Sequence, residues 1–428
     1  LVGSEMCIRD SPGAGAPTCR RHRLSSMAEL PFSTSIDKLG GGGRRIEALI
    51  RSAVPEVAPA LAVSVWRAGS PWYEAYAGVI DPATGTGQVG FRTCFDLASL
   101  TKIFTATAAL RLANDFKLDL DAPVVDVIGE LGRDVPRAID GGQEPLSRRL
   151  LPVPDELASA TADPRTVTFR QLLTHTGGLA PWRSVFEAAG PVPAPPTEPD
   201  PIPPAERLTA GLAAACGYPF VSRPGEACHY SDLGFILLGE AVSRVFGTPL
   251  DEALQALIRD RLGLDSLTFT PLRVGRASSE IAPTSFDREW RGRRCHGEVE
   301  DENAAGLGGV AGHAGLFATV HDVARFGVAW LRTDPRLRLE RFFRGAVTDQ
   351  SGIGAGRGLG WQLQPADYLA PLGDGAYGHT GFTGTSLAVD PERDLVVALL
   401  TNRVYAGRSH EGIGELRLQL HTLAADLA

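Results

Sequence analysis

The stretch Ser99-Leu100-Thr101-Lys102, continued by the run IFTATAALRLA, is the most informative part of this 428-residue chain. Residues three positions apart share one face of a helix, so a helix over residues 99–113 places the Lys102 amine beside the Ser99 hydroxyl. The run is apolar on most sides, which is typical of a helix buried inside a domain. Burial lowers the pKa of a lysine, so the pattern predicts a Lys102 amine that accepts the proton of a nucleophilic serine.

Two further observations concern this pair. Ser35-Ile36-Asp37-Lys38 has the same spacing, but a flexible run, Gly40 to Gly43, follows it, and no stable helix is expected there. Lys38, Lys102 and Lys117 are the only lysines among 42 Lys and Arg residues. Arginine stays protonated, so Lys102→Arg is expected to lose acylation while remaining folded. A lysine whose amine extends from a helix end toward water is the structural alternative.

Tyr230-Ser231-Asp232 precedes the apolar run LGFILLGEAV, and Ser231 or Asp232 suits the N-cap of a helix over residues 232–246. Tyr230 then lies at the entrance of that helix. It is either an ordinary core aromatic or, beside a cationic Lys102, a phenolate-forming group that transfers protons.

His379-Thr380-Gly381 leads into the strand-like run TSLAVD, which places a cation-capable side chain and a glycine at a sheet edge. The backbone amides of Phe382 and Ser99 are then positioned to form an oxyanion hole. A similar triplet, His175-Thr176-Gly177, ends the helix-like run FRQLLT, where its glycines fit a helix C-cap. The strand context selects His379 as the candidate for the site.

The three motifs, in this order and about 130 and 150 residues apart, resemble those of the class C β-lactamases, the D-Ala-D-Ala carboxypeptidases and the family VIII carboxylesterases. The resemblance covers roughly Ile46 to Ala424 and includes the runs VTFRQLLTHTGGL, GGVAGHAGLFATVHDVARF and GLGWQL. It implies an α+β fold of the β-lactamase/transpeptidase type. In this fold an antiparallel sheet is flanked by helices, an all-helical region is inserted, and the site lies in the cleft between them.

The same resemblance implies roles for individual residues. Ser99 is the expected nucleophile, Lys102 and Tyr230 activate it and return the proton to the leaving group, and His379 supplies the electrostatic role of the third motif. The expected substrate-binding residues are Asp232, Thr380, Gly381 and Phe382. Asp232 stands where those β-lactamases have asparagine and His379 where they have lysine. These departures favour a general acyl acceptor over a dedicated β-lactamase, and penicillin binding stays open.

The order of predicted elements gives the expected domain organisation. Strand-like runs lie near both ends, at residues 61–66 and 72–79 and at residues 386–389 and 395–401, with helical patterns between them. We therefore expect a discontinuous sheet domain, residues 40–98 and 320–428, and a mainly helical region, residues 99–319. Residues 1–26, which precede Met27, are expected to be a non-native or disordered extension.

Several other stretches carry weaker expectations. Eight prolines between Pro191 and Pro204 predict either a linker or an ordered loop bordering a cleft. Asp301-Glu302-Asn303 suggests a loop over the cleft, GIGAGRGLG an ordinary loop, and His313 and His321 structural or surface histidines.

Composition limits the possible functions. The net charge is −8 and no basic run occurs beyond Arg20 to Arg23, so no nucleic-acid partner is expected. No apolar run reaches the roughly 18 residues that a membrane span needs. Four scattered cysteines outside the extension predict reduced thiols and a cytoplasmic location: Cys94, Cys216, Cys228 and Cys295.

The expected function is hydrolysis of a small ester, amide or peptide through an acyl-enzyme on Ser99, with no metal or organic cofactor. The absence of a G-x-S-x-G motif argues against an α/β-hydrolase. Two alternatives stay open at this point. One is a β-lactamase or a penicillin-binding carboxypeptidase, and the other is a non-catalytic binding or scaffold protein of the same fold.

Overall fold

The computed structural model describes residues 31–428, so the expected extension, residues 1–26, lies outside the described part of the chain. Within that part the main element is an 8-stranded antiparallel sheet, in the order β1-β3-β2-β15-β14-β13-β12, with β4 paired to β3. The strands are β1 (Phe32–Asp37), β2 (Ala60–Arg67), β3 (Ser70–Asp81), β4 (Thr86–Gln88), β12 (Gln362–Leu363), β13 (Tyr377–Thr380), β14 (Ser386–Asp390) and β15 (Leu395–Thr401). The two ends of the chain thus build one sheet, because β2 pairs directly with β15.

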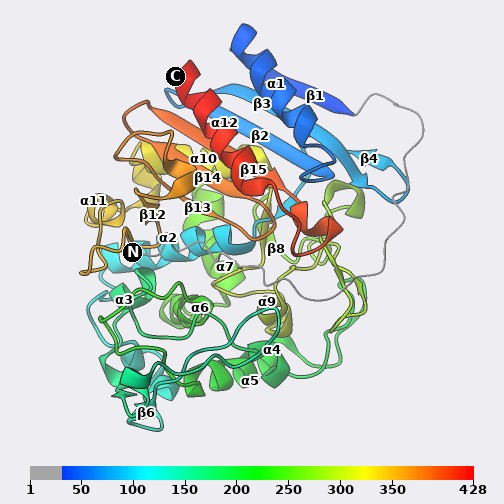
Figure 1. The fold of residues 1–428 in the computed structure, drawn as a ribbon. Helices are drawn as coiled ribbons and strands as arrows, with labels where there is room; N and C mark the ends of the chain where they lie inside the picture. The colour runs from blue at the N-terminus through cyan, green and yellow to red at the C-terminus, as the bar shows by residue number, and fades with distance from the viewer. Residues whose placement is uncertain (1–30) are drawn as a thin grey trace.

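Helices cover both faces of this sheet (Figure 1). α1 (Gly41–Ala53) and α12 (Ile413–Leu427) pack on one face, and α10 (Val320–Leu331) packs on the other. Successive side chains of a strand point to opposite faces, so alternate residues of β15 enter the two apolar cores. Burial on both faces explains why the central strands read as continuous apolar runs.

The remaining helices lie mostly between the two halves of the sheet in the sequence. They are α2 (Thr101–Asn114), α3 (Phe169–Leu173), α4 (Val185–Ala188), α5 (Pro204–Gly217), α6 (Asp232–Phe246), α7 (Leu250–Leu254), α8 (Asp260–Leu262), α9 (Glu302–Gly306) and α11 (Phe343–Ala346). Short strands accompany them: β5 (Phe95–Asp96), β8 (Thr268–Phe269) and β11 (Leu316–Ala318) form one small sheet, β6 (Arg137–Ala138) pairs with β7 (Thr161–Ala162), and β9 (Phe286–Asp287) pairs with β10 (Arg293–Arg294). α2 lies between the large sheet and the helical region in Figure 1, with every residue from Thr101 to Ala113 buried.

The predicted fold class, an antiparallel sheet flanked by helices with a helical region inserted, is confirmed. The predicted bounds of α6 and β15 agree with the structure. The prediction of a flexible Gly40 to Gly43 run is wrong, because α1 already begins at Gly41. A Cβ atom at Gly43 would lie 2.5 Å from the Asp37 carboxylate, so the helix start packs closely on the end of β1. β1 also belongs to the sheet, so the sheet domain includes residues before position 40, where the sequence predicts it to begin.

The proline-rich segment between Pro191 and Pro204 is an ordered loop held by two arginines. The fully buried Arg207 side chain pairs with Asp200 at 2.9 Å and donates a hydrogen bond to the Pro191 carbonyl at 2.8 Å. Arg293 donates to the Pro193 carbonyl at 3.0 Å. Of the two expectations, the structure therefore favours the ordered loop over the linker.

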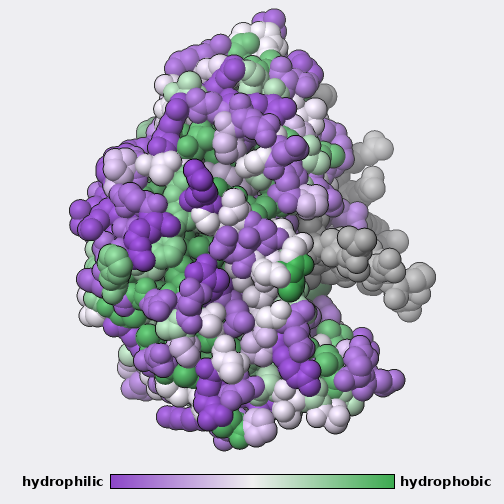
Figure 2. Space-filling view, turned by 90° about the vertical axis from the view of Figure 1, so that its left-hand side faces the viewer, coloured by the Kyte–Doolittle hydropathy of each residue, from purple (hydrophilic) through white to green (hydrophobic). Residues whose placement is uncertain are grey.

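The face drawn in Figure 2 is covered mostly by hydrophilic residues, with apolar residues in smaller areas between them. No single helix among residues 31–428 is long and apolar enough to cross a membrane. α6 followed by the helical segment Leu250–Leu262 has sufficient length and apolar composition only as a pair bent by 76°. Apolar residues of both segments belong to the main core of the protein.

Candidate active site

Ser99 and Lys102 lie side by side at the start of α2. Ser99 is in a short 3-10 turn, Ala98–Leu100, and Lys102 is in the first turn of α2. The helix predicted to begin at Ser99 therefore begins with this 3-10 turn, and α-helical geometry follows from Thr101. The Lys102 ammonium donates to the Ser99 hydroxyl oxygen at 2.9 Å and to the His313 carbonyl at 3.2 Å. The Lys102 side chain is fully buried, so the alternative of a lysine extending to water is wrong.

The second serine–lysine pair with the same spacing has no such arrangement. Ser35 lies on β1 and donates to the Glu74 carboxylate at 3.2 Å, and both Ser35 and Lys38 are exposed. Of the two serine–lysine pairs, only Ser99 and Lys102 lie side by side at a helix start in the described residues.

Asp232 is the charged neighbour of Lys102. Its carboxylate lies 2.7 Å from the Lys102 nitrogen, at the first residue of α6. Burial alone lowers the pKa of Lys102, but the charge of Asp232, together with Tyr230, raises it more, so the pKa lies above its usual value. The prediction that burial brings the pKa of Lys102 down toward neutrality is wrong. Lys102 is an ammonium ion in the resting site.

Tyr230 is held at the entrance of α6 by the cap of that helix. Ser231 is the N-cap, as predicted, because its hydroxyl accepts a hydrogen bond from the Gly234 amide at 3.1 Å. The Ser231 amide donates to Nδ1 of His175 at 3.0 Å, and the His175 ring packs on the Tyr230 ring at 4.5 Å between centroids. The Lys102 nitrogen lies 4.8 Å from the Tyr230 ring centroid and hydrogen-bonds to the tyrosine side chain.

His175 therefore supports Tyr230. The prediction that glycines cap the helix before it is wrong in detail: α3 ends at Leu173, and His175 itself takes the left-handed conformation, with φ 59°. Burial lowers the pKa of His175 far below its usual value, so its ring is neutral and Nδ1 can accept the Ser231 proton. His175 and the first helix turn of α6 fix the position of the tyrosine.

The third motif is fastened to the backbone just before Ser99. Thr383 and Thr385, in the turn between β13 and β14, donate from their hydroxyls to the carbonyls of Asp96 and Leu97 at 2.8 and 3.0 Å. A Cβ atom on Gly381 would lie 2.6 Å from the Leu97 carbonyl oxygen, so only glycine permits this approach. The sequence-predicted neighbourhood of the third motif and the Ser99 turn is thus present in the structure.

His379 is buried on β13 and carries no charge. Burial, followed by the positive charge of Lys102, lowers its pKa to about 3. Its Nδ1 lies 2.8 Å from the Thr380 carbonyl, which can only accept a hydrogen bond, so Nδ1 carries the proton and Nε2 is a bare acceptor. The prediction of a cation-capable side chain in the third motif is wrong. The Tyr230 and His379 rings lie 5.9 Å apart.

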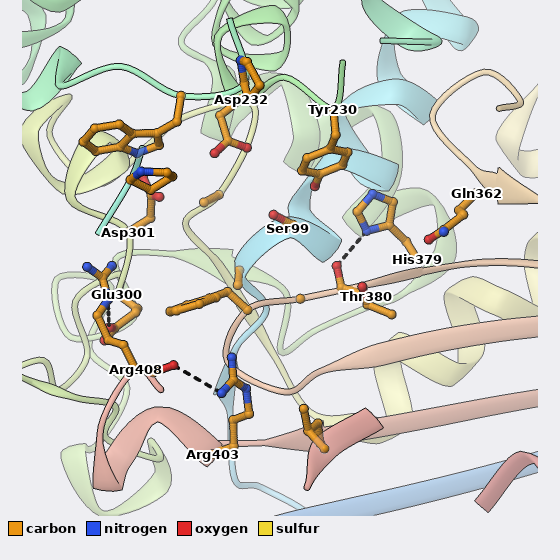
Figure 3. Close-up of a pocket in the computed structure, with 18 of the residues that line it drawn as sticks. Ser99, Tyr230, Asp232, Glu300, Asp301, Gln362, His379, Thr380, Arg403 and Arg408 are labelled. Carbon is orange, nitrogen blue, oxygen red and sulfur yellow. Dashed lines mark hydrogen bonds and ion pairs between the residues drawn. The ribbon is translucent and has the colours of Figure 1, made fainter. Parts of the chain in front are cut away.

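A pocket of about 390 Å³ opens above Ser99 (Figure 3). Its wall includes seven of the eight predicted site residues: Ser99, Tyr230, Asp232, His379, Thr380, Gly381 and Phe382. Lys102, the eighth, lies buried beneath Ser99. In Figure 3, Tyr230, His379 and Gln362 lie to one side of Ser99, and Glu300, Asp301 and Arg408 lie to the other. All eight residues therefore come together at one site.

Sequence reasoning missed the arginines in the pocket wall, which are Arg357, Arg403, Arg408 and Arg417. Arg357 comes from the glycine-rich loop that was expected to be ordinary, and the other three follow β15 or lie on α12. No motif marks them in the sequence. The fold, in which β2 and β15 pair in one sheet, brings them to the pocket.

The expected acidic loop does border the pocket. Asp301 accepts a hydrogen bond from the Ala304 amide as the cap of α9, and it pairs with His313 Nε2 at 2.8 Å. His313 is therefore a buried structural histidine whose carbonyl also accepts from Lys102. Charge pairing with His313 lowers the pKa of Asp301 against the opposing effect of burial. The carboxylate is ionised.

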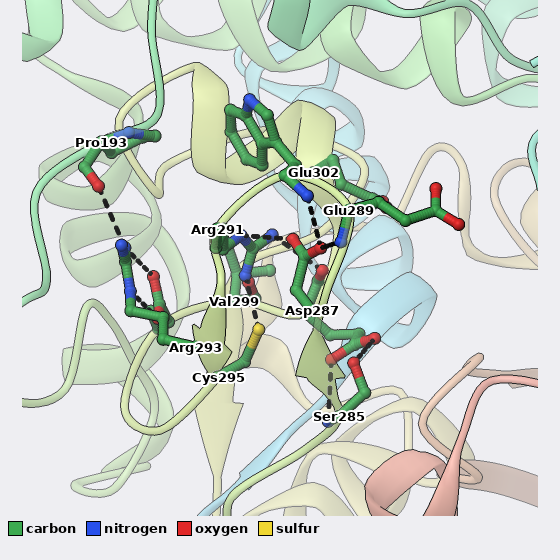
Figure 4. Close-up of polar contacts among 12 residues, drawn as sticks. Pro193, Ser285, Asp287, Glu289, Arg291, Arg293, Cys295, Val299 and Glu302 are labelled. Atoms are coloured by element: carbon green, nitrogen blue, oxygen red, sulfur yellow. Dashed lines mark hydrogen bonds and ion pairs between the residues drawn. The ribbon is translucent and has the colours of Figure 1, made fainter.

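A buried arginine fixes this loop from behind (Figure 4). Arg291 donates to the carbonyls of Val299 and Glu300 at 2.7 and 2.9 Å and to the Cys295 sulfur at 2.8 Å. Its Nε lies 3.4 Å from the Asp287 carboxylate. These contacts hold the segment that carries Glu300, so the acidic side of the pocket has a fixed position before substrate binds.

Comparison with known proteins agrees with this geometry. A family model described as Beta-lactamase matches residues 46–422. The chain is 28% identical over 334 residues to a protein named putative D-alanyl-D-alanine carboxypeptidase from Salmonella agona (strain SL483), covering 73% of this chain and 70% of that protein. A protein of the same name from Escherichia coli (strain K12) is 28% identical over 344 residues, with the same two coverages.

Solved structures show the same fold at lower identity. EstCE1, described as a hydrolase with promiscuous acyltransferase activity, has a TM-score of 0.64 and 19% identity over 90% of this chain and 99% of that one. A penicillin-binding protein homolog from Caulobacter crescentus has a TM-score of 0.64 and 19% identity over 93% of this chain and 100% of that one. With the family match spanning most of its length, the chain belongs to the β-lactamase family.

Proposed function

We propose that the protein is a serine hydrolase that forms an acyl-enzyme on Ser99 and releases the acid by hydrolysis of an ester or a small peptide. The observation that carries the proposal is the hydrogen bond of 2.9 Å between the buried Lys102 ammonium and the Ser99 oxygen at the floor of the pocket. An ammonium ion in this position stabilises the negative charge that develops as the serine loses its proton.

In the proposed mechanism, Tyr230 is the group that moves the proton. Lys102 is already protonated, because Asp232 raises its pKa, so it cannot take the Ser99 proton itself. The Tyr230 oxygen, which lies beside Lys102, accepts that proton while Ser99 Oγ bonds to the substrate carbonyl carbon. The amides of Ser99 and Phe382 bind the carbonyl oxygen as it becomes negative.

Tyr230 then returns the proton to the departing oxygen or nitrogen as its bond to the acyl carbon breaks. A water molecule attacks the acyl-enzyme by the same route in the second half of the reaction and frees Ser99. His379, with a bare Nε2 toward the site side of β13, accepts hydrogen bonds instead of supplying charge. Thr380 and Gly381 complete the wall against which the substrate lies.

The role of Asp232 gives a testable pH dependence. Asp232→Asn keeps the shape of the side chain and removes its charge, while the burial that lowers the pKa of Lys102 remains. We expect that pKa to fall, so the alkaline limb of kcat/KM lies at lower pH in the variant than in the wild type. The measurement is kcat/KM for a p-nitrophenyl ester between neutral and alkaline pH.

Asp374→Asn, on an exposed loop, is the matched control and is expected to leave the profile in place. If Lys102 instead acts as a neutral base, Asp232→Asn raises activity at neutral pH, and the mechanism above is wrong.

Substrate class separates the remaining alternatives. The relatives named putative D-alanyl-D-alanine carboxypeptidase support a peptide substrate, and an uncharged His379 does not favour the carboxylate of a β-lactam. We expect p-nitrophenyl esters or D-alanyl peptides to be turned over with a higher kcat/KM than nitrocefin. Faster turnover of nitrocefin than of both other substrates contradicts this. Turnover of none favours the non-catalytic alternative. The predicted cytoplasmic location stays a prediction.

A further inference from the structure

Arg403 follows β15 directly and lines the pocket close to Phe382. Its guanidinium carbon lies 5.0 Å from the Phe382 ring centroid, and its backbone amide donates to the Thr383 carbonyl at 3.1 Å. The residue is therefore tied to the turn between β13 and β14, which is itself fastened to the backbone just before Ser99. Arg403 is a fixed part of the pocket wall.

The positive charge of a neighbouring arginine in the same pocket wall is balanced by two carboxylates. Arg408 lies 5.4 Å from the same Phe382 ring and forms two hydrogen bonds with the Glu302 carboxylate, at 2.5 and 2.8 Å. Its Nε also lies 3.4 Å from Glu300. Glu302 and Glu300 therefore neutralise Arg408 and leave it little attraction for a substrate anion.

Arg403 has no such partner in the part of the chain that the structure describes. Its terminal nitrogen donates to two backbone carbonyls, those of His410 at 2.5 Å and Arg408 at 3.4 Å, and its buried Nε has no hydrogen-bond partner. No carboxylate there lies within 4.0 Å of its guanidinium. Glu300 is held instead by Ser285, whose hydroxyl donates to it at 2.7 Å. Burial lowers the pKa of Arg403 and the charge of Glu300 raises it, but the guanidinium stays protonated and its hydrogen bonds go only to carbonyls.

The position of Arg403 relative to Ser99 decides which part of a substrate it meets. The leaving group must lie near Tyr230, which protonates it in the proposed mechanism. The acyl chain is bonded to the same carbon and points away from the leaving group. In Figure 3, Arg403 and Tyr230 lie on opposite sides of Ser99, so the acyl chain extends toward Arg403.

We propose that Arg403 binds an anionic group, a carboxylate in the first instance, carried by the acyl part of the substrate. This inference rests on the proposed function, because the direction of the acyl chain follows from the roles of Ser99 and Tyr230. The preferred substrates are then half-esters or amides of dicarboxylic acids and acyl groups with an acidic side chain. A carboxylate can accept two parallel hydrogen bonds from a guanidinium, which gives this recognition its geometry.

The test compares two substrates of equal shape. One is the mono-p-nitrophenyl ester of adipic or suberic acid, and the other is the same ester with the free carboxylate replaced by a carboxamide. At fixed pH and ionic strength we expect kcat/KM to be about tenfold or more higher for the acid than for the amide, as for a charged hydrogen bond. Arg403→Gln is expected to bring this ratio close to one, and Arg403→Lys to an intermediate value.

Arg288→Gln is the matched control, because Arg288 also stacks on a phenylalanine, Phe286, but lies outside the pocket wall. It is expected to keep the wild-type ratio. Equal turnover of acid and amide by the wild type, or an unchanged ratio in Arg403→Gln, overturns the inference while leaving the proposed function intact.

Binding to Ser99→Ala, measured by calorimetry, separates the two proposals. If no ester is turned over, the proposed function fails. Tighter binding of the acid than of the amide, lost on adding Arg403→Gln, still supports the anion site. Equal binding of the two esters to Ser99→Ala contradicts the proposed anion site.

Discussion

Ser99→Ala is expected to lower kcat/KM for a p-nitrophenyl ester by about 10⁴-fold or more, the scale seen when a covalent nucleophile is removed. Ser99 is the hydroxyl that the buried Lys102 ammonium reaches, at 2.9 Å, at the floor of the pocket. The loss is expected in kcat, since the rest of the pocket wall is unchanged. Steady-state kinetics with wild-type and variant protein measures it.

The variant is expected to fold normally. Ser99 is only half-buried, and without its oxygen Lys102 still has the Asp232 carboxylate and the His313 carbonyl. Ser35→Ala removes the serine of the second S-x-x-K motif and is the control that should retain activity. A Ser99→Ala protein with more than a small fraction of wild-type turnover and an intact fold rules out the nucleophile assignment.

Lys102→Met is expected to lower kcat/KM by about 10³-fold, within the range for loss of an acid–base or charge-stabilising group. Methionine has a similar length and fills the buried space, but it supplies no positive charge to the Ser99 oxygen or to Tyr230. The acyl-enzyme then forms slowly, and a burst of p-nitrophenol in pre-steady-state kinetics is expected to disappear.

Lys102→Met leaves the Asp232 carboxylate without its ion-pair partner, which costs stability. The double variant Lys102→Met, Asp232→Asn removes both charges and separates this effect from catalysis. It is expected to regain thermal stability and to stay inactive. Lys117→Met, at an exposed lysine, is the control. Recovery of activity in the double variant contradicts a catalytic role for the Lys102 charge.

Lys102→Arg is a weaker test than the sequence suggests. The expected loss of acylation rested on Lys102 as a proton acceptor, whereas the structure makes it an ammonium ion. Arginine would keep that charge, but a guanidinium is larger than an ammonium group, and the Lys102 side chain is fully buried. Loss of activity in this variant therefore has two explanations, and the methionine pair is more informative.

Much of the fold was predictable because the signals are local or repeated along the chain. α6 begins after a serine cap and ends at Phe246, before Gly247 in the left-handed conformation, so both ends are marked in the sequence. β15 is apolar at every position except its last, Thr401, because both of its faces are covered. The sequence does not predict the start of α1, because its glycines favour flexibility. In the structure the start of this helix packs closely on β1, with Gly43 against Asp37.

The eight predicted site residues do come together, but their charges were not predictable from motifs. The Lys102–Asp232 ion pair joins residues on α2 and α6, and only their three-dimensional distance shows that attraction outweighs burial. The pKa of His379 is lowered instead, because burial and the nearby Lys102 charge both oppose protonation. Arg403 carries no sequence signal, because its proposed role depends on the absence of a carboxylate within 4.0 Å of it among residues 31–428.

The nucleophilic character of Ser99 can be measured by covalent labelling. The protein is treated with a fluorophosphonate probe, digested, and analysed by peptide mass spectrometry, with Ser99→Ala and Ser35→Ala in parallel. We expect one adduct, on the peptide containing Ser99, present in Ser35→Ala and absent in Ser99→Ala. No adduct on Ser99 in the wild type, or an equal adduct in Ser99→Ala, would contradict it.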